Sequence, residues 1–187
     1  MIKFLENYPF KWLGVKIGEG FSVYDGHLGD IAGQPHLGID YVLKKGNEFA
    51  SFEVFNMFEG SAEFGVSTDL GKYFIIGKTE GDFLLQVVYA HLDNINEDLQ
   101  KYAIIQGDRE FIIPARYQLG WTGKTGLTHG IRQLHIEVHQ KNLVTGEKQK
   151  LDPYGVYDRF SSGKYRQPGQ TLAGLDHLWT SNDPQFV

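Results

Sequence analysis

The sequence predicts an all-β protein, built mostly of antiparallel sheets with little helix. Glycine is abundant, at 23 of 187 residues, and the apolar segments are short. Gly, Asn and Asp separate these segments, which is typical of consecutive antiparallel strands joined by turns. A hydrophobic share of 41% is enough for a chain of this length to bury a substantial core. The length also predicts a single domain over residues 1–187.

The predicted strands are segments in which apolar residues form short runs or alternate with polar ones. They cover residues 38–43, 49–58, 61–67, 72–77, 83–90, 117–122 and 134–140. One helical turn is expected over residues 94–101. Asn94 or Asn96 can cap its first turn, and Glu97 and Asp98 suit its positive end.

Composition excludes several classes of function. The net charge is −5, and no cluster of Lys or Arg along the chain provides the basic footprint of a nucleic-acid-binding protein. No apolar run approaches the length of a membrane-spanning helix. Cysteine is absent, so a metal would be held by His and carboxylate groups rather than by thiolates. These features leave the compartment and the oligomeric state open.

The segment Arg132-Gln-Leu-His-Ile-Glu-Val-His139 carries the most informative motif. In an extended strand, successive side chains point to opposite faces, so one set of residues faces the core and the other faces outward. The apolar set is Leu134, Ile136 and Val138, and the polar set is Gln133, His135, Glu137 and His139. This alternation makes His135 a strong candidate for a metal ligand.

Two more candidate ligands, His36 and Asp40, lie on either side of Gly38 at the start of an apolar strand. Two imidazoles and a carboxylate are donors that zinc accepts in a catalytic site, with a fourth position open for water. We therefore predict that His36, Asp40 and His135 hold zinc, which lowers the pKa of its water to about 7. Taken alone, His36 and Asp40 also fit a loop histidine beside a capping aspartate.

Two further histidines stand near expected strand ends and loops. His91 follows the apolar run 83–90, where the strand is expected to give way to a polar turn. Functional side chains are often presented there, although a neutral histidine with one hydrogen bond fits the same place. His129 lies in the Gly-rich segment 120–130, which is predicted to form a loop over the site.

In this order, the segments around His36, His91 and His135 resemble the lysostaphin-type (LytM-like) zinc endopeptidases of bacterial cell-wall metabolism. The resemblance covers about residues 33–154, leaving an N-terminal lead-in and a C-terminal extension. It implies the β fold of that family and the zinc ligands His36, Asp40 and His135. It also implies that His91, which follows Tyr-Ala and precedes Leu, is catalytic, and that the substrate is a peptide of peptidoglycan.

The sequence departs from the family pattern at Gln133, where the family has a second catalytic histidine. A glutamine can orient water or an oxyanion, but it cannot exchange a proton near pH 7. His129 is a candidate substitute. Glu137 is a candidate to support a neighbouring ligand rather than His135, its own strand neighbour, and it equally fits a plain surface carboxylate.

The leading expectation is a zinc metalloendopeptidase that cleaves peptidoglycan cross-bridges or stem peptides with a metal-activated water. The alternative is a zinc-binding, catalytically weak or inactive cell-wall-binding or regulatory domain, because of Gln133. A phosphotransferase carrier is a third class, but such carriers lack the Asp40 ligand pattern. An extracytoplasmic or cell-wall location is implied by the resemblance, although residues 1–10 do not read as a secretory signal.

Aromatic residues provide candidate walls for a substrate groove. Trp121, Tyr117 and Tyr154 could line a groove for a glycine-rich or stem peptide, although each also fits core or edge packing. The tail from Tyr154 to Val187 is expected to be a packed extension, with a wall of the substrate groove as the alternative.

Overall fold

The computed structural model describes residues 2–11, 20–25, 29–31, 34–36, 38–106, 111–154, 168–169, 171–174 and 176–187. For residues 20–36 and 102–106 the description covers the backbone only, where it covers them at all. The described residues form an 11-stranded sheet and a separate two-stranded one. Neighbouring strands in both sheets are antiparallel, and helix is confined to one element, which confirms the all-β prediction.

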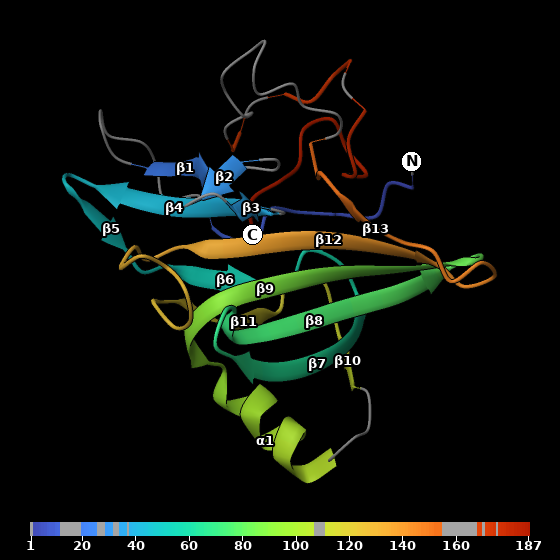
Figure 1. Ribbon diagram of the computed structural model, residues 1–187, viewed down its shortest axis with the longest axis horizontal. Helices are drawn as coiled ribbons and strands as arrows, with labels where there is room; N and C mark the ends of the chain where they lie inside the picture. The colour runs from blue at the N-terminus through green and yellow to red at the C-terminus, as the bar shows by residue number, and fades with distance from the viewer. Residues whose placement is uncertain are drawn as a thin grey trace.

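The elements, in chain order, are β1 (Gly20–Asp25), β2 (Gly29–Ile31), β3 (Gln34–His36), β4 (Ile39–Lys45), β5 (Glu48–Ala50), β6 (Glu53–Phe55), β7 (Gly60–Ser67), β8 (Gly71–Glu80), β9 (Phe83–Ile95), α1 (Glu97–Gln106), β10 (Phe111–Ile113), β11 (Gln118–Thr122), β12 (Leu134–Asn142) and β13 (Lys148–Leu151). The main path of the large sheet is β1-β4-β12-β9-β8-β7-β10. Figure 1 shows this path as one curled sheet, with α1 on the side of β7.

The curled sheet encloses an apolar core on one face and presents polar side chains on the other. In β12, Leu134, Ile136 and Val138 are fully buried in the core, as the alternation of the sequence predicts. Their partners across β9 include Tyr89 and Val87, which are equally buried. The intervening residues of β12 therefore lie on the outer face.

Most of the predicted strands are present, but residues 49–58 do not form one strand. β5 pairs with β4, whereas β6 pairs with β11, so the segment leaves one strand and joins another. Between them, the Phe52 amide donates to Thr122 Oγ1 at 3.0 Å, and Ser51 Oγ donates to the Thr122 carbonyl. These hydrogen bonds to Thr122 of β11 satisfy the segment between β5 and β6, which forms no strand ladder of its own.

The helix begins later than predicted, at Glu97, and runs to Gln106. Asn96 caps it, because its side-chain oxygen accepts the Asp98 amide at 3.0 Å and its carbonyl accepts the Gln100 amide. Five short strands, β1, β2, β3, β10 and β13, were not predicted from the sequence. Among the described residues, no helix is long and apolar enough to cross a membrane.

The two ends of the chain pack against each other. Isolated parallel bridges join Leu5 to Trp179 and Asn7 to Gln185, and Trp179 is fully buried. For its described residues, the C-terminal tail is therefore a packed extension. Tyr154 also belongs to the core, because it is buried and its hydroxyl lies 2.8 Å from that of Tyr41. Of the two roles considered for Tyr154, core packing is therefore confirmed and the groove wall is not.

Candidate functional site

Strand pairing brings Asp40 and His135 together. The two residues are direct partners in the β4–β12 ladder, although 95 positions separate them in the chain. His135 Nδ1 donates to Asp40 Oδ1 at 2.8 Å. Both side chains are almost inaccessible, with relative exposures of 6% and 1% for the residues. A carboxylate buried this deeply requires a positive or hydrogen-bonding partner, and His135 is one.

Gly38 makes room for the imidazole of His135. A Cβ atom built on Gly38 would lie 2.4 Å from His135 Cε1 and 2.6 Å from Nε2, much closer than van der Waals contact allows. The main chain at the start of β4 can therefore approach the ring only because residue 38 has no side chain. This is the signal in the sequence that marks a close approach beside Asp40.

On the prediction that Asp40 and His135 hold zinc, replacing Gly38 by alanine is expected to displace the His135 ring and weaken zinc binding at least tenfold, a loss typical of disturbing the support of a ligand. The measurement is zinc affinity in competition with a coloured chelator. Gly46→Ala is the matched control, because Gly46 has φ +60° but no atom within 4 Å of an added Cβ. The control should lose stability while its zinc affinity stays unchanged. Equal affinity in the Gly38 variant would contradict this account of the site.

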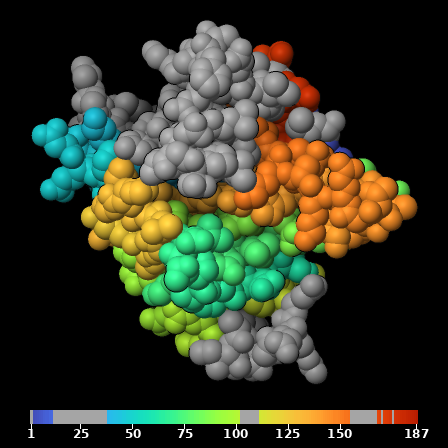
Figure 2. Space-filling model, viewed as in Figure 1, coloured from blue at the N-terminus to red at the C-terminus, as the bar shows by residue number. Residues whose placement is uncertain are grey.

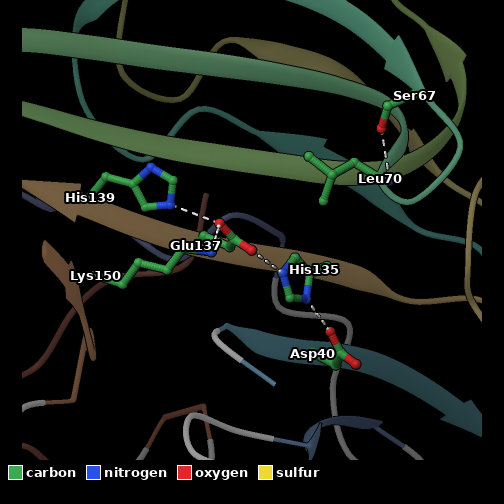
Figure 3. A network of polar contacts seen from close by, with 7 residues as sticks. All are labelled: Asp40, Ser67, Leu70, His135, Glu137, His139 and Lys150. Carbon is green, nitrogen blue, oxygen red and sulfur yellow. Dashed lines mark hydrogen bonds and ion pairs between the residues drawn. The ribbon is translucent and has the colours of Figure 1, made fainter. Parts of the chain in front are cut away.

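The second ring nitrogen of His135 also faces a carboxylate. His135 Nε2 lies 3.2 Å from Glu137 Oε1, so the ring stands between Asp40 and Glu137 (Figure 3). The expectation that Glu137 supports a ligand other than His135 is therefore wrong. Burial lowers the pKa of His135, but hydrogen bonds and charges from both carboxylates outweigh burial and raise it to about 9. The two carboxylates thus favour the protonated form of His135.

Glu137 is held in turn by two further groups on its other oxygen. His139 Nε2 and Lys150 Nζ each lie 2.7 Å from Glu137 Oε2. Burial raises the pKa of Glu137, but these hydrogen bonds and that of His135 hold it well below its ordinary value. The carboxylate therefore stays ionised and keeps a fixed direction towards His135, which is what an outer support of a metal ligand requires.

His91 does not stand at the end of its strand, contrary to the sequence prediction. β9 continues through it to Ile95, and the ladder with β8 is irregular here: Lys72 pairs with Leu92, and Phe74 with Tyr89. One residue of β8 thus faces two residues of β9, which defines a β-bulge. His91 takes φ 64°, a conformation that costs free energy in residues with a side chain. Such strain is often found where a bulge re-aims a functional side chain.

Three hydrogen bonds fix His91 in this position. Its amide donates to the Leu70 carbonyl at 2.9 Å, and its carbonyl accepts the Gly123 amide at 2.8 Å. Its ring Nδ1 donates to the Thr125 carbonyl at 2.9 Å. A carbonyl can only accept, so Nδ1 carries the proton and Nε2 bears the lone pair of the neutral ring. The ring centres of His91 and His135 are 5.7 Å apart.

Of the remaining residues singled out in the sequence, some lie beside the pair of Asp40 and His135 and others lie on the surface. Gln133 is buried, at 6% exposure, and its backbone bridges Gly123, next to the residues that hold His91. His129 is exposed, with φ 49°, and none of the described hydrogen bonds or ring contacts joins it to Asp40, His91 or His135. Trp121 is 42% exposed, whereas Tyr117 packs partly against the core.

His36 has a described backbone in β3, but its side chain lies outside the described residues. Among the described side chains, no three His, Cys, Asp or Glu residues are placed to hold a metal. Two of the three predicted donors do meet: Asp40 Oδ1 and His135 Nδ1, an oxygen and a nitrogen of the kinds that zinc accepts. A cation can take the place of the proton between them, so this half of the site fits zinc.

No family model and no curated protein matches the chain. Among solved structures, it is similar to the crystal structure of a zinc-containing peptidase from Vibrio cholerae, with 21% sequence identity and a TM-score of 0.45. The match covers 73% of this chain but only 37% of that peptidase chain. At this identity and TM-score, the similarity assigns neither an activity nor a metal to the present chain.

Proposed function

We propose that this protein is a zinc metallopeptidase that hydrolyses peptide bonds in peptidoglycan. The observation that carries the proposal is the buried pair of Asp40 Oδ1 and His135 Nδ1, 2.8 Å apart, with the ring of His91 beside it. A buried oxygen and nitrogen donor next to a histidine that is not part of the pair is an arrangement suited to metal-assisted hydrolysis. Peptidoglycan as substrate rests on the resemblance of the His36, His91 and His135 segments.

In this proposal, Asp40, His135 and His36 hold the zinc. When bound, zinc supplies Lewis acidity and a water of lowered pKa. The remaining chemistry belongs to the protein. Glu137, locked by Lys150 and His139, accepts the Nε2 proton of His135 and thereby fixes the tautomer that leaves Nδ1 for the metal.

His91 is the group in the described site that can move a proton. Its Nδ1 is committed to Thr125, so Nε2 is the atom that would accept a proton from water and later release it to the leaving amine. The positive φ and the three hydrogen bonds hold the ring in a fixed direction without any contribution from the substrate. A preorganised base of this kind needs no rearrangement during catalysis.

Gln133 favours a second candidate function, a zinc-binding domain with weak or no hydrolysis that binds or regulates at the cell wall. Its side chain is neutral at all relevant pH values and lies on the same face of β12 as His135. In an active enzyme, the same amide would orient water or stabilise an oxyanion by donating a hydrogen bond. Turnover distinguishes the two functions.

The proposal is tested by incubating the purified, zinc-supplemented chain with peptidoglycan and with oligoglycine peptides, with and without a zinc chelator. The expected result is release of new amino termini from at least one of these substrates, which stops with chelator and returns when zinc is restored. Hydrolysis that continues at the same rate in the presence of the chelator would contradict the metal mechanism. Zinc binding without turnover on any of these substrates would favour the second candidate.

Gln133→His tests whether the glutamine limits catalysis. A histidine at this position adds a titratable group about 7 Å along the strand from His135, and we expect turnover to rise about tenfold. Initial rates of wild type and variant are compared at several pH values, with zinc content measured in both. Gln133→Asn serves as the control for altered packing and should gain nothing. A faster wild type would mean that the glutamine is itself a working hydrogen-bond donor.

A further inference from the structure

The outer face of the β12–β13 hairpin carries a row of basic side chains that begins next to the candidate site. His139 and Lys141 follow His135 and Glu137 on the same face of β12, at every second residue. Register places Lys150 directly opposite His139, and Lys148 directly opposite Lys141. These four residues, His139, Lys141, Lys148 and Lys150, form the basic stripe. The hairpin that bears them projects from the body of the molecule, in orange (Figure 2).

Two lysines of the basic stripe form no ion pair with a described carboxylate. Glu137 neutralises Lys150 at 2.7 Å, but among the described residues no carboxylate lies within ion-pair distance of Lys141 or Lys148. Like charges directly opposite each other across two strands destabilise the pairing. The protein as a whole has a net charge of −5, so this local excess of positive charge runs against its composition. Unpartnered lysines on neighbouring strands are available to an anionic ligand, whose charge would relieve this repulsion.

We propose that the basic stripe binds carboxylate groups of an extended peptide substrate, so that the protein acts on peptides bearing free acidic groups rather than on neutral glycine bridges. This inference rests on the proposed function, because it concerns the substrate of the same site. The contacts are ion pairs and hydrogen bonds from Lys141 and Lys148 to the carboxylates.

The spacing suits an extended peptide that runs along β12. His139 is four residues beyond His135 and Lys141 is six, which correspond to about 14 and 20 Å in a strand. An extended ligand has nearly the same rise per residue. A carboxylate three to five residues from the bond at the candidate site would therefore come within reach of a lysine side chain.

A peptide fits the stripe better than a long polyanion does. The stripe is two residue pairs long, and it is bounded by Glu137 at one end. At the other end stands the β8–β9 turn, where the Asp82 carbonyl accepts the Leu143 amide. A polyanion would extend past the stripe onto a protein of net negative charge, where repulsion would oppose its binding.

The test compares two capped octapeptides of alanine and glycine that differ only in carrying two glutamates or two glutamines. Their affinities for the zinc-supplemented chain are measured by calorimetry at low and high salt. At low salt, the glutamate peptide is expected to bind about five- to tenfold more tightly, as two exposed ion pairs allow. At high salt, the preference should disappear because exposed charges are screened.

The decisive variant is Lys141→Gln with Lys148→Gln, which should reduce the preference below about twofold. Lys150 is kept, because it holds Glu137. The matched control, Lys45→Gln with Lys101→Gln, removes the same charge from β4 and α1 and should keep the preference. Equal binding of the two peptides by wild type, or an unchanged preference in the decisive variant, overturns the inference. Tight binding of a polyphosphate without glutamate preference also overturns it.

Peptide hydrolysis is followed in the same samples, so the two proposals can fail separately. Glutamate preference without cleavage of either peptide supports the stripe and contradicts the proposed function. Chelator-sensitive cleavage with equal rates for both peptides supports the proposed function and overturns the stripe.

Discussion

Replacing Asp40 by alanine is expected to remove zinc from the protein, from about one ion per chain to less than about a tenth. Asp40 would be the negatively charged metal ligand of the pair, and its Oδ1 atom lies 2.8 Å from His135 Nδ1. In the proposed site, its loss leaves the His135 imidazole as the only donor among the described side chains, which is too few for stable zinc binding. Hydrolysis should fall to background in the same variant. The measurement is elemental analysis after dialysis against a weak chelator.

Two further variants, a second ligand variant and a control, are needed to interpret the Asp40 result. His135→Ala should lose zinc to the same extent, because it removes the other donor. Asp93→Ala is the control: Asp93 is a carboxylate on β9 that pairs with Arg132 at 2.9 Å, and its loss should leave zinc in place. All variants are expected to fold, since an all-β core of this size does not depend on a metal. His135→Ala should nevertheless lose stability, because it removes a hydrogen bond from the buried Asp40 carboxylate. Full zinc occupancy in both ligand variants would show that the metal is bound elsewhere.

Replacing His91 by asparagine is expected to lower turnover by about 10²- to 10⁴-fold while zinc stays bound, as for a proton-transfer group that is not a ligand. Asparagine is chosen because it tolerates the left-handed conformation that His91 adopts at φ 64° better than other residues do. The variant therefore removes the imidazole without adding backbone strain. Initial rates and zinc content are measured on the same preparation.

His129→Asn is the matched control for this variant, because His129 is also a histidine with positive φ, at 49°, but it is exposed. It should keep wild-type turnover. If the His129 variant lost activity and the His91 variant kept it, the role of proton-transfer group would belong to His129. Loss of zinc from the His91 variant would contradict its assignment as a residue that does not bind the metal.

The alternation in residues 134–140 was enough to predict both the buried face of β12 and the outward direction of His135. The meeting of Asp40 with His135 was expected only as part of the predicted zinc ligand set, because 95 positions separate the two residues. The alternation depends on a pattern within one segment. Local patterns reflect local geometry, which the sheet then preserves.

Features that depend on pairing between strands could not be predicted. The bulge at His91 arises because β9 has one residue more than β8 across the ladder, and the apolar run 83–90 carries no trace of it. The bond between Glu137 and His135 lies within β12 and was missed for a different reason: residues two apart on a strand were taken to be independent. The basic stripe forms only when β13 folds back onto β12, so no cluster appears along the chain.

The most direct test of the zinc site is anomalous X-ray scattering, recorded at the zinc edge from crystals grown with zinc. The account predicts one strong peak about 2.0 to 2.2 Å from both Asp40 Oδ1 and His135 Nδ1, with Glu137 still bonded to His135 Nε2. A peak between Glu137 and His139 instead, or none near Asp40, would contradict it.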